Sequence, residues 1–288
     1  MRQMTRDGRL TEREDGQDRL LAALYGCMAG RLLLKPLTAP VVSRAVGRVL
    51  SSRISRVLIS GFVRRNRIDM TQFEDREYRS YNDFFCRKIR PGVRPIDREP
   101  SHLISPCDSK LTVLPIAKDL RFSLKHTEYT VGSLLKDEGL AAEYAGGYAL
   151  IFRLTVDDYH RYGYVADGTE GPAVRIPGVL HTVNPIANDY FPIYKENSRE
   201  YSVLHTEQFG DILMMEVGAL MVGKIVNLRE TETVRRGQEK GYFQFGGSTV
   251  VLLIRDGCVE IDGDILKNSR KQIETVVKYG EKIGVSCL

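Results

Sequence analysis

The chain has 288 residues, of which 42% are hydrophobic and 27% are charged, as in an ordinary folded protein. This length gives ample surface for a buried core and predicts one large domain or two smaller ones. The five cysteines are scattered, odd in number and without CxxC spacing, which argues against a zinc site and against a disulfide framework. We therefore expect no metal.

The front of the chain is basic and intermittently apolar. The first nineteen residues are polar and charged, and we expect them to be frayed. No acidic residue occurs between Asp18 and Asp69, where arginines are frequent, although the net charge of the whole chain is only +5. The apolar stretches that begin at Leu20 are far shorter than the ~20 residues that span a bilayer. A long charged start that contains acids also does not fit a signal peptide.

A basic amphipathic helix is predicted within this region. Apolar residues recur at three- and four-residue spacing, at Leu50, Ile54, Val57, Leu58 and Phe62, and arginines occupy much of the other face. Such a helix can lie in a membrane interface with its arginines against anionic head groups. It can equally pack on its own domain with a solvated basic face, and the sequence does not decide between the two. No recognition motif accompanies the charge, so we expect no nucleic acid as a partner.

The pattern changes after Pro95. Short apolar runs alternate with glycine, proline and aspartate turns, which predicts strands at 148–154, 212–217, 221–228, 241–245, 249–254 and 258–261. Closely spaced strands of this kind favour an antiparallel sandwich or barrel. The sequence therefore predicts an α+β chain, with a basic helical region at 1–95 and a β-rich domain at 96–288.

Three positions carry residue types that nucleophilic catalysis uses. Ser248 follows Gly246 and Gly247 at the start of an apolar run, so its hydroxyl can attack the Gly247 carbonyl and cut the chain. His160 lies in a loop rich in acids and tyrosines and can act as a general base. Asp108, in a tight turn, can orient that histidine. Each also has a plain structural interpretation, as a surface serine after a glycine turn, a loop histidine and an Asx-turn aspartate.

These residues are compatible with more than one chemistry. Acid, base and nucleophile occur in several chain orders on unrelated folds. A conventional serine hydrolase usually has a GxSxG elbow, whereas here Gly-Gly-Ser-Thr leads into a strand. His181 is a second candidate base, although a structural role is favoured for it. The remaining histidines, His102, His126 and His205, are expected to be structural.

A series of short motifs runs from about Tyr78 to Ile283. They are Tyr81-Asn82-Asp83-Phe84-Phe85, Arg90-Pro91, Arg94-Pro95-Ile96, Ser105-Pro106-Cys107-Asp108, Asp158-Tyr159-His160-Arg161, Pro177-Gly178, Val183-Asn184-Pro185, Gly218-Ala219, Val222-Gly223 and Phe245-Gly246-Gly247-Ser248-Thr249. Each motif alone is weak, but together and in this order they are highly specific. They make this part of the chain resemble the phosphatidylserine decarboxylases.

The resemblance implies a proenzyme that cuts itself between Gly247 and Ser248, leaving a β chain of 1–247 bound to an α chain of 248–288. Ser248 would become a covalent pyruvoyl group, whose ketone condenses with the amine of phosphatidylserine and accepts electrons as carbon dioxide leaves. The product would be phosphatidylethanolamine. The resemblance also implies peripheral binding to an anionic membrane surface, at the cytoplasmic face of the cell membrane.

The resemblance assigns Ser248 as the nucleophile and Asp108 as the group that orients the base, and it matches His160 to the family's Tyr-His-Arg motif. Many members have a second histidine three residues further on as the base for self-cleavage, but this chain has Gly163 there. Either His160 performs both tasks or His181 supplies one of them; we favour His160 for the triad and His181 as a helper in decarboxylation.

Two further points stay open from the sequence. Arg161 is a possible accessory group, because its charge could hold the carboxylate or the phosphate of the lipid. The alternatives to a decarboxylase are a serine hydrolase that uses Asp108, His160 and Ser248, and a non-catalytic membrane-binding β domain. The first alternative predicts an uncut chain with a reactive serine, and the second predicts no chemistry.

Overall fold

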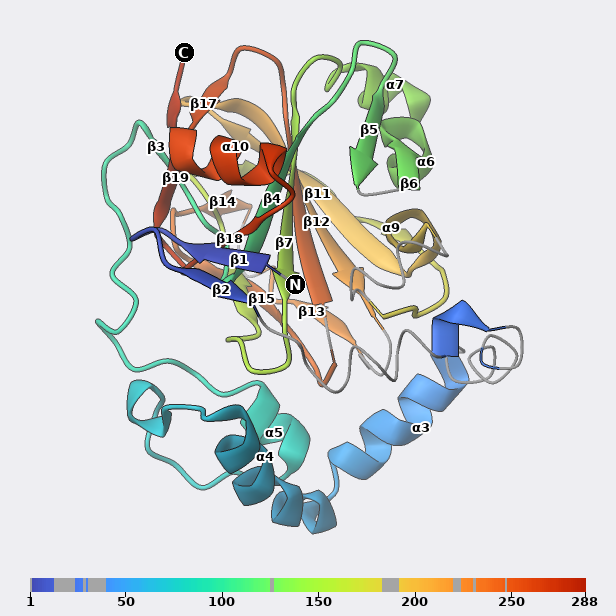
Figure 1. Cartoon of the computed structure of the whole chain (residues 1–288), viewed down its shortest axis with the longest axis vertical. Helices are drawn as coiled ribbons and strands as arrows, with labels where there is room; N and C mark the ends of the chain where they lie inside the picture. The colour runs from blue at the N-terminus through green and yellow to red at the C-terminus, as the bar shows by residue number, and fades with distance from the viewer. Residues whose placement is uncertain are drawn as a thin grey trace.

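The computed structural model describes residues 2–12, 24–27, 30, 40–124, 127–182, 192–219, 224–229, 232–246 and 248–288. Several features singled out in the sequence lie outside these residues: residues 13–19 of the start expected to be frayed, the first residues of the apolar stretches that begin at Leu20, His126, the segment 183–185, residues 221–223 of the strand expected at 221–228, and Gly247. Within the described part of the chain, one long sheet forms the body and a helical region lies at one end of it (Figure 1).

The main sheet has the strand order β14-β9-β11-β12-β16-β7-β4-β18-β1-β2, and β10 pairs with β11 off this path. Neighbouring strands are antiparallel except β1 and β18, which run parallel. The strands are β1 (Arg2–Thr5), β2 (Leu10–Glu12), β4 (Ser109–Pro115), β7 (Tyr148–Leu154), β9 (Gly168–Glu170), β10 (Val174–Ile176), β11 (Arg199–Thr206), β12 (Gly210–Gly218), β14 (Thr233–Val234), β16 (Ser248–Ile254) and β18 (Glu274–Val277). The α+β prediction is confirmed, and the sheet is open rather than closed into a barrel.

Strand β16 lies in the middle of this sheet and is buried along its whole length. Its side chains alternate between the two faces, so that Val250 and Leu252 enter one apolar cluster and Val251 and Leu253 enter the other. Because both faces are covered, the strand reads in the sequence as one continuous apolar run. Ser248 is its first residue, and a strand fixed on both sides gives this serine a rigid support.

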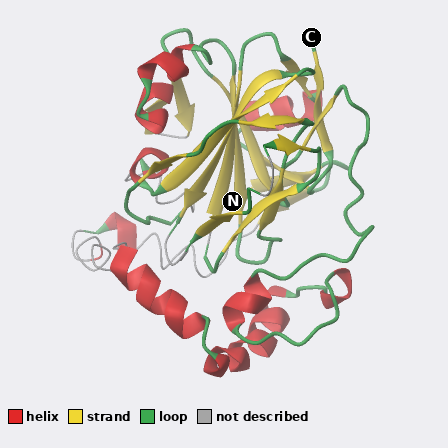
Figure 2. Cartoon of the chain, turned by 180° about the vertical axis from the view of Figure 1, so that it is seen from behind, coloured by secondary structure: helices red, strands yellow, loops and turns green. Residues whose placement is uncertain are grey.

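The helical region comprises α3 (Pro40–Leu50), the 3₁₀ turn η1 (Arg53–Val57), α4 (Leu58–Asn66), the 3₁₀ turn η2 (Met70–Gln72) and α5 (Tyr81–Phe85). The prediction of one continuous amphipathic helix across Leu50 to Phe62 is wrong. Helix α3 ends at Leu50, and the helical backbone resumes only at Arg53, first as η1 and then as α4. Hydroxyls compete with the helical pattern there: Ser55 donates to the Leu50 carbonyl at 2.8 Å and Ser52 donates to a carbonyl three residues back. Seen from behind, this region stands below the sheet (Figure 2).

The first described residues are ordered strands. β1 and β2 form a hairpin, and β1 extends the main sheet through β18. Arg6, in the turn between them, donates to the Asp262 carboxylate at 2.7 Å and to the Lys282 carbonyl at 2.9 Å. The expectation of a frayed start is therefore wrong for residues 2–12, which join the β-rich body. The domain boundary after residue 95 stays a prediction.

Smaller elements surround the main sheet. Three short sheets consist of β13 (Ile225–Asn227), β15 (Glu239–Phe243) and β8 (Arg161–Gly163), of β17 (Val259–Ile261), β19 (Lys282–Ser286) and β3 (His102–Ile104), and of β5 (Arg121–Leu124) and β6 (Thr127–Thr130). Further helices among the described residues are α6 (Val131–Leu135), α7 (Glu138–Ala142), α9 (Ile193–Glu196) and α10 (Gly263–Arg270), and residues 24–26 are also helical. Of the helices described, none combines the length and the apolar character needed to cross a bilayer.

Candidate active site

Ser248 and His160 meet in the interior. Nδ1 of His160 lies 3.2 Å from the Ser248 hydroxyl oxygen, and neither residue is exposed to solvent. Ser248 begins β16, and His160 directly precedes β8. Within the described residues, no other side chain hydrogen-bonds to this hydroxyl. The structure thus brings together two of the three residues that the sequence singled out.

The second ring nitrogen of His160 determines where its proton sits. Nε2 lies 3.0 Å from the Thr155 carbonyl oxygen. Because a carbonyl can only accept, Nε2 carries the proton and Nδ1 accepts from the Ser248 hydroxyl. Burial, helped by the charge of Arg87, lowers the pKa of His160 to about 3. The histidine is therefore neutral at neutral pH, with its basic nitrogen directed at the serine.

Thr155 is itself held in a tight turn. Asp158 accepts from both the backbone amide of Thr155, at 2.7 Å, and its hydroxyl, at 2.8 Å. Lys110 on β4 donates to the Asp158 carboxylate at 2.6 Å and to the Thr155 hydroxyl at 2.7 Å. This buried network fixes the carbonyl that orients His160, so the ring orientation rests on Asp158 and Lys110.

Helix α5 covers the same site from the other side. The Phe85 ring stacks against the His160 ring, with 4.1 Å between the ring centres. The Asn82 side chain accepts a hydrogen bond from the Phe245 amide at 3.0 Å, three residues before Ser248. The Ser80 hydroxyl caps the helix by accepting from the Asp83 amide. A short capped helix therefore holds both the base and the turn that leads to the nucleophile.

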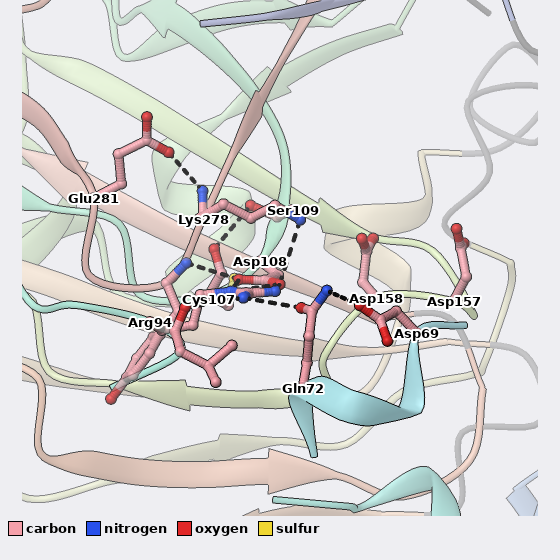
Figure 3. Close-up of polar contacts among 12 residues, drawn as sticks. Asp69, Gln72, Arg94, Cys107, Asp108, Ser109, Asp157, Asp158, Lys278 and Glu281 are labelled. Carbon is pink, nitrogen blue, oxygen red and sulfur yellow. Dashed lines mark hydrogen bonds and ion pairs between the residues drawn. The ribbon is translucent and has the colours of Figure 1, made fainter. Parts of the chain in front are cut away.

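Asp108 lies in a different hydrogen-bond network (Figure 3). Its carboxylate accepts from the Arg94 guanidinium at 2.7 Å and from the Tyr279 amide at 2.9 Å, and the Lys278 ammonium lies 3.5 Å away. Burial by itself would raise the pKa of Asp108, but Arg94 and Lys278 hold it below its ordinary value. No contact described for Asp108 joins it to His160, so its role as the orienting acid stays a prediction.

Position 163 has no room for a side chain. A Cβ on Gly163 would lie 2.3 Å from the Tyr279 hydroxyl oxygen and 2.7 Å from the Gln238 carbonyl oxygen. The Tyr279 hydroxyl donates to the Gly237 carbonyl at 2.8 Å, which holds the ring in this place. Tyr279 therefore occupies the space that a side chain at position 163 would need. The second histidine expected from the family resemblance would stand at this position.

His181 faces other partners than Ser248. Its Nδ1 lies 3.4 Å from the Tyr25 hydroxyl, and its Nε2 lies 3.6 Å from the Glu196 carboxylate. Burial lowers the pKa of His181. Asn197 links the His181 backbone to the Gly218 carbonyl, and Gly218 is the strand partner of Ser248. The backbone of His181 is thus connected to the start of β16 through Asn197 and β12.

Arg161 is engaged in contacts within the protein. It donates twice to the Cys86 carbonyl, at 2.7 and 2.9 Å, and it forms an ion pair with Glu239. Its guanidinium also lies over the Tyr242 ring, 4.9 Å from the ring centre. These contacts join α5 to the β8–β15 sheet. The prediction that Arg161 binds the carboxylate or the phosphate of the lipid therefore has no support from these contacts.

Because His160 is buried in its neutral form, we expect the free energy of unfolding to fall in mild acid. In the unfolded chain a histidine has a pKa of about 6.5, whereas burial lowers the pKa of His160 to about 3. The unfolded state therefore binds more protons between these values, and stability falls as the pH drops below about 6.5. This one group should remove about 2 kcal/mol of the free energy of unfolding between pH 7 and pH 5.

Chemical denaturation of the Ser248→Ala protein, which keeps His160 in place and lacks the serine hydroxyl, measures this effect. Adding His160→Gln should reduce the difference in stability between pH 7 and pH 5 by about 2 kcal/mol. Adding His205→Gln, which replaces a half-exposed histidine bound to Asp211, should leave most of the difference. An unchanged pH dependence in the His160→Gln protein would show that His160 is not held neutral.

The geometry is that of an enzyme site with an activated serine nucleophile, because the Ser248 hydroxyl donates to a neutral histidine.

A family model described as phosphatidylserine decarboxylase matches residues 81–285. A phosphatidylserine decarboxylase proenzyme 2 of Clostridium acetobutylicum is 48% identical over 92% of this chain and 91% of its own length. Phosphatidylserine decarboxylase proenzymes of Ruminiclostridium cellulolyticum and Chlamydia felis are 40% and 38% identical, over 92% and 93% of this chain and 91% and 92% of their own lengths. The chain is an enzyme that belongs to the phosphatidylserine decarboxylase family.

Several residues of the site were not found by sequence reasoning. Thr155 was passed over, although Thr155 and Asp158 have the spacing of a hydroxyl and an acid that close a turn, which is a readable signal. Asn82 and Phe85 lie in the motif at 81–85, but nothing in the sequence connects them to Phe245 or His160. Tyr279 carries no local signal, because its contact with position 163 joins segments far apart in the chain.

Proposed function

We propose that this enzyme decarboxylates phosphatidylserine to phosphatidylethanolamine after cutting itself between Gly247 and Ser248. The observation that carries the proposal is the 3.2 Å contact between the Ser248 hydroxyl and the acceptor nitrogen of His160. Family membership supports the reaction, and the word proenzyme in the names of the relatives supports the cut. The products of the cut are a β chain of 1–247 and an α chain of 248–288 that stay together.

Self-cleavage begins when the Ser248 hydroxyl gives its proton to His160 Nδ1. The oxygen attacks the carbonyl carbon of Gly247, the bond from that carbon to the Ser248 nitrogen breaks, and the nitrogen receives the proton from His160. The resulting ester loses the Cα proton of residue 248 and expels the Gly247 carboxylate, which leaves a carbon–carbon double bond. Tautomerisation and attack by water then release ammonia and leave a pyruvoyl group at the new chain end.

The residues around position 248 fit such a group. Gly246 adopts φ +133°, a conformation that side chains disfavour, and so lets the chain turn directly before the cut. The Phe85 ring lies against the His160 ring, and His160 has no exposed surface. A pyruvoyl group supplies a ketone that takes up the substrate amine and accepts the electrons left when carbon dioxide departs. His160 Nδ1, no longer facing a hydroxyl, moves protons at that position.

Product analysis with purified protein tests this function. Dispersed phosphatidylserine should yield carbon dioxide and phosphatidylethanolamine in equal amounts. Hydroxylamine, a ketone reagent, should abolish the turnover, whereas a serine-directed phosphonate should not. A serine hydrolase that uses Asp108, His160 and Ser248 would give the reverse response and release fatty acid or lysolipid. A non-catalytic membrane-binding domain would give no product at all.

We also propose that the helical part of region 1–95 binds peripherally to an anionic membrane, at the cytoplasmic face of the cell membrane, and that 96–288 is the catalytic domain. Large apolar side chains of α3, η1 and α4 are open to solvent: Ile54 is 82% exposed and Val57 77% exposed. Exposed arginines surround them, at Arg48, Arg53, Arg56, Arg64, Arg65 and Arg67. Apolar side chains next to arginines are the chemistry of an anionic lipid surface.

Replacing Ile54 and Val57 together by serine should weaken binding to vesicles that contain anionic lipid by about tenfold or more, because two apolar side chains no longer enter the interface. Both side chains are exposed, so folding should not change. Sedimentation with vesicles measures the binding. The control is the double change Leu10→Ser and Val174→Ser, at two exposed positions on the main sheet. Equal binding by the two double variants would refute this contact surface.

A further inference from the structure

The guanidinium of Arg87 is buried and forms no ion pair with a carboxylate of the described residues. Arg87 follows α5 and has no exposed surface. Its Nη2 lies 3.4 Å from two backbone carbonyls, which is long for a hydrogen bond, while its Nε and Nη1 have no partner among the described residues. The charge is sandwiched between the rings of Phe73 and Phe84, at 4.3 and 4.8 Å from the ring centres.

The other buried arginines of the described chain each donate at least two hydrogen bonds to described residues. Arg153 forms a two-point ion pair with Glu274, with contacts of 2.6 and 2.7 Å. Arg199 donates to four backbone carbonyls, and Arg236 donates to two. Arg87 therefore differs from these arginines in having two donors, Nε and Nη1, that no described residue accepts from.

Such a buried cation is costly. A charge removed from water needs an opposite charge or a full set of hydrogen bonds to offset its desolvation. Contacts with aromatic faces offset only part of this cost, because a ring face carries no full negative charge. Burial also lowers the pKa of Arg87. Unused donors on a buried cation indicate that an anionic group from outside the protein completes the site.

Arg87 lies beside the catalytic pair. The two carbonyls near its Nη2 belong to residues 157 and 158, in the turn that leads to His160. Phe85, two residues before Arg87, stacks on the His160 ring. On its other side, α5 contacts the helices that expose apolar side chains, through hydrogen bonds from Tyr81 and Asn82 to serines of that region. Arg87 is thus positioned between the surface suited to lipid and the reacting position.

We propose that Arg87 binds the phosphodiester of the lipid head group, an inference that rests on the proposed decarboxylase function. In phosphatidylserine the phosphorus and the reacting amine are separated by only four bonds, so a phosphodiester on Arg87 places the amine toward residue 248. The substrate carboxylate is a poorer partner, because a guanidinium bound to it would stabilise the negative charge that must leave as carbon dioxide forms. The phosphodiester keeps its charge throughout the reaction.

The cut after Gly247 gives the lipid access to Arg87. Phe245 contacts Tyr81 and Phe85 of α5 in the uncut chain, and the cut frees the chain end that carries Phe245.

Two measurements on the processed enzyme test this role. The first is turnover of dispersed dihexanoylphosphatidylserine, and the second is calorimetric binding of dihexanoylphosphatidylethanolamine, which keeps the phosphodiester but lacks the carboxylate. Arg87→Met should raise the KM for the serine lipid and the Kd for the ethanolamine lipid by about 10- to 100-fold each, with kcat changed much less. Arg87→Lys should recover part of both affinities, because a point charge remains. The thermal stability of Arg87→Met should not fall, since methionine removes a buried unpaired charge.

The control is Lys88→Gln, which removes an exposed positive charge one residue away and should leave both constants within about twofold of wild type. Unchanged constants in Arg87→Met would overturn the proposal, as would a raised KM with an unchanged Kd, which would assign Arg87 to the carboxylate. If Arg87→Met and Arg87→Gln both fail to cut themselves, Arg87 serves the fold and the proposal is wrong. A wild-type protein that binds the ethanolamine lipid through Arg87 but turns over no serine lipid would instead refute the proposed function.

Discussion

Replacement of Ser248 by alanine is expected to leave one uncut chain without decarboxylase activity. The hydroxyl is the only atom at this position that can attack the Gly247 carbonyl, and it is also the source of the ketone on which decarboxylation depends. Alanine loses a single oxygen at the start of β16, so the sheet should fold as before. Denaturing electrophoresis and release of carbon dioxide from phosphatidylserine measure the two effects.

Ser202→Ala is the matched control for this variant. Ser202 is also buried in the main sheet, on β11, where its hydroxyl donates to the Glu170 carboxylate at 2.6 Å. It should lose some stability but still cut itself and turn over lipid. Two chains from the Ser248→Ala protein would refute the assigned nucleophile, and loss of cutting in Ser202→Ala would show that any buried serine-to-alanine change disturbs processing.

Replacement of His160 by glutamine should slow self-cleavage by about 10²- to 10⁴-fold, the usual contribution of a general base. His160 is the only described residue that hydrogen-bonds to the Ser248 hydroxyl, and its unprotonated nitrogen faces the serine. The half-time for conversion of one chain into two, followed after expression is stopped, gives the rate. Thermal unfolding at pH 7 checks that the variant is folded.

The same experiment decides between the two histidines left open by the sequence. His181→Gln should cut itself at nearly the wild-type rate, because the described contacts of the ring are with Tyr25 and Glu196. His205→Gln, at a surface position, is the control. A large loss in His181→Gln with normal cutting in His160→Gln would reverse the assignment of the base.

Local patterns predicted three central strands of the main sheet, β7, β12 and β16, whereas other strands of that sheet, β4 and β11 among them, were not predicted. The expected strand at 148–154 coincides with β7, and the run after Ser248 is β16, because a buried strand shows its apolar character in the residues themselves. The helix expected across Leu50 to Phe62 failed for an equally local reason. Spacing alone does not register that Ser52 and Ser55 can bond to nearby carbonyls and end the helix.

The candidate site was predicted only where one segment carried the chemistry. Ser248 and His160 were named from their own neighbourhoods, and they do meet. The expected partner of His160 was a carboxylate, whereas the structure has the Thr155 carbonyl, and a backbone oxygen leaves no trace in a sequence. Arg87 gave no signal either, because its unusual feature is that two of its donors have no partner among the described residues of the folded chain.

The intact mass of the purified wild-type protein is the most direct test of the account. It should show two chains, 1–247 and 248–288, with the shorter one lighter by one ammonia than a chain that begins with serine. This loss marks the conversion of Ser248 into a pyruvoyl group. A single chain of 288 residues, or a 248–288 chain with an intact serine and a free amine, would contradict the proposed origin of the catalytic ketone.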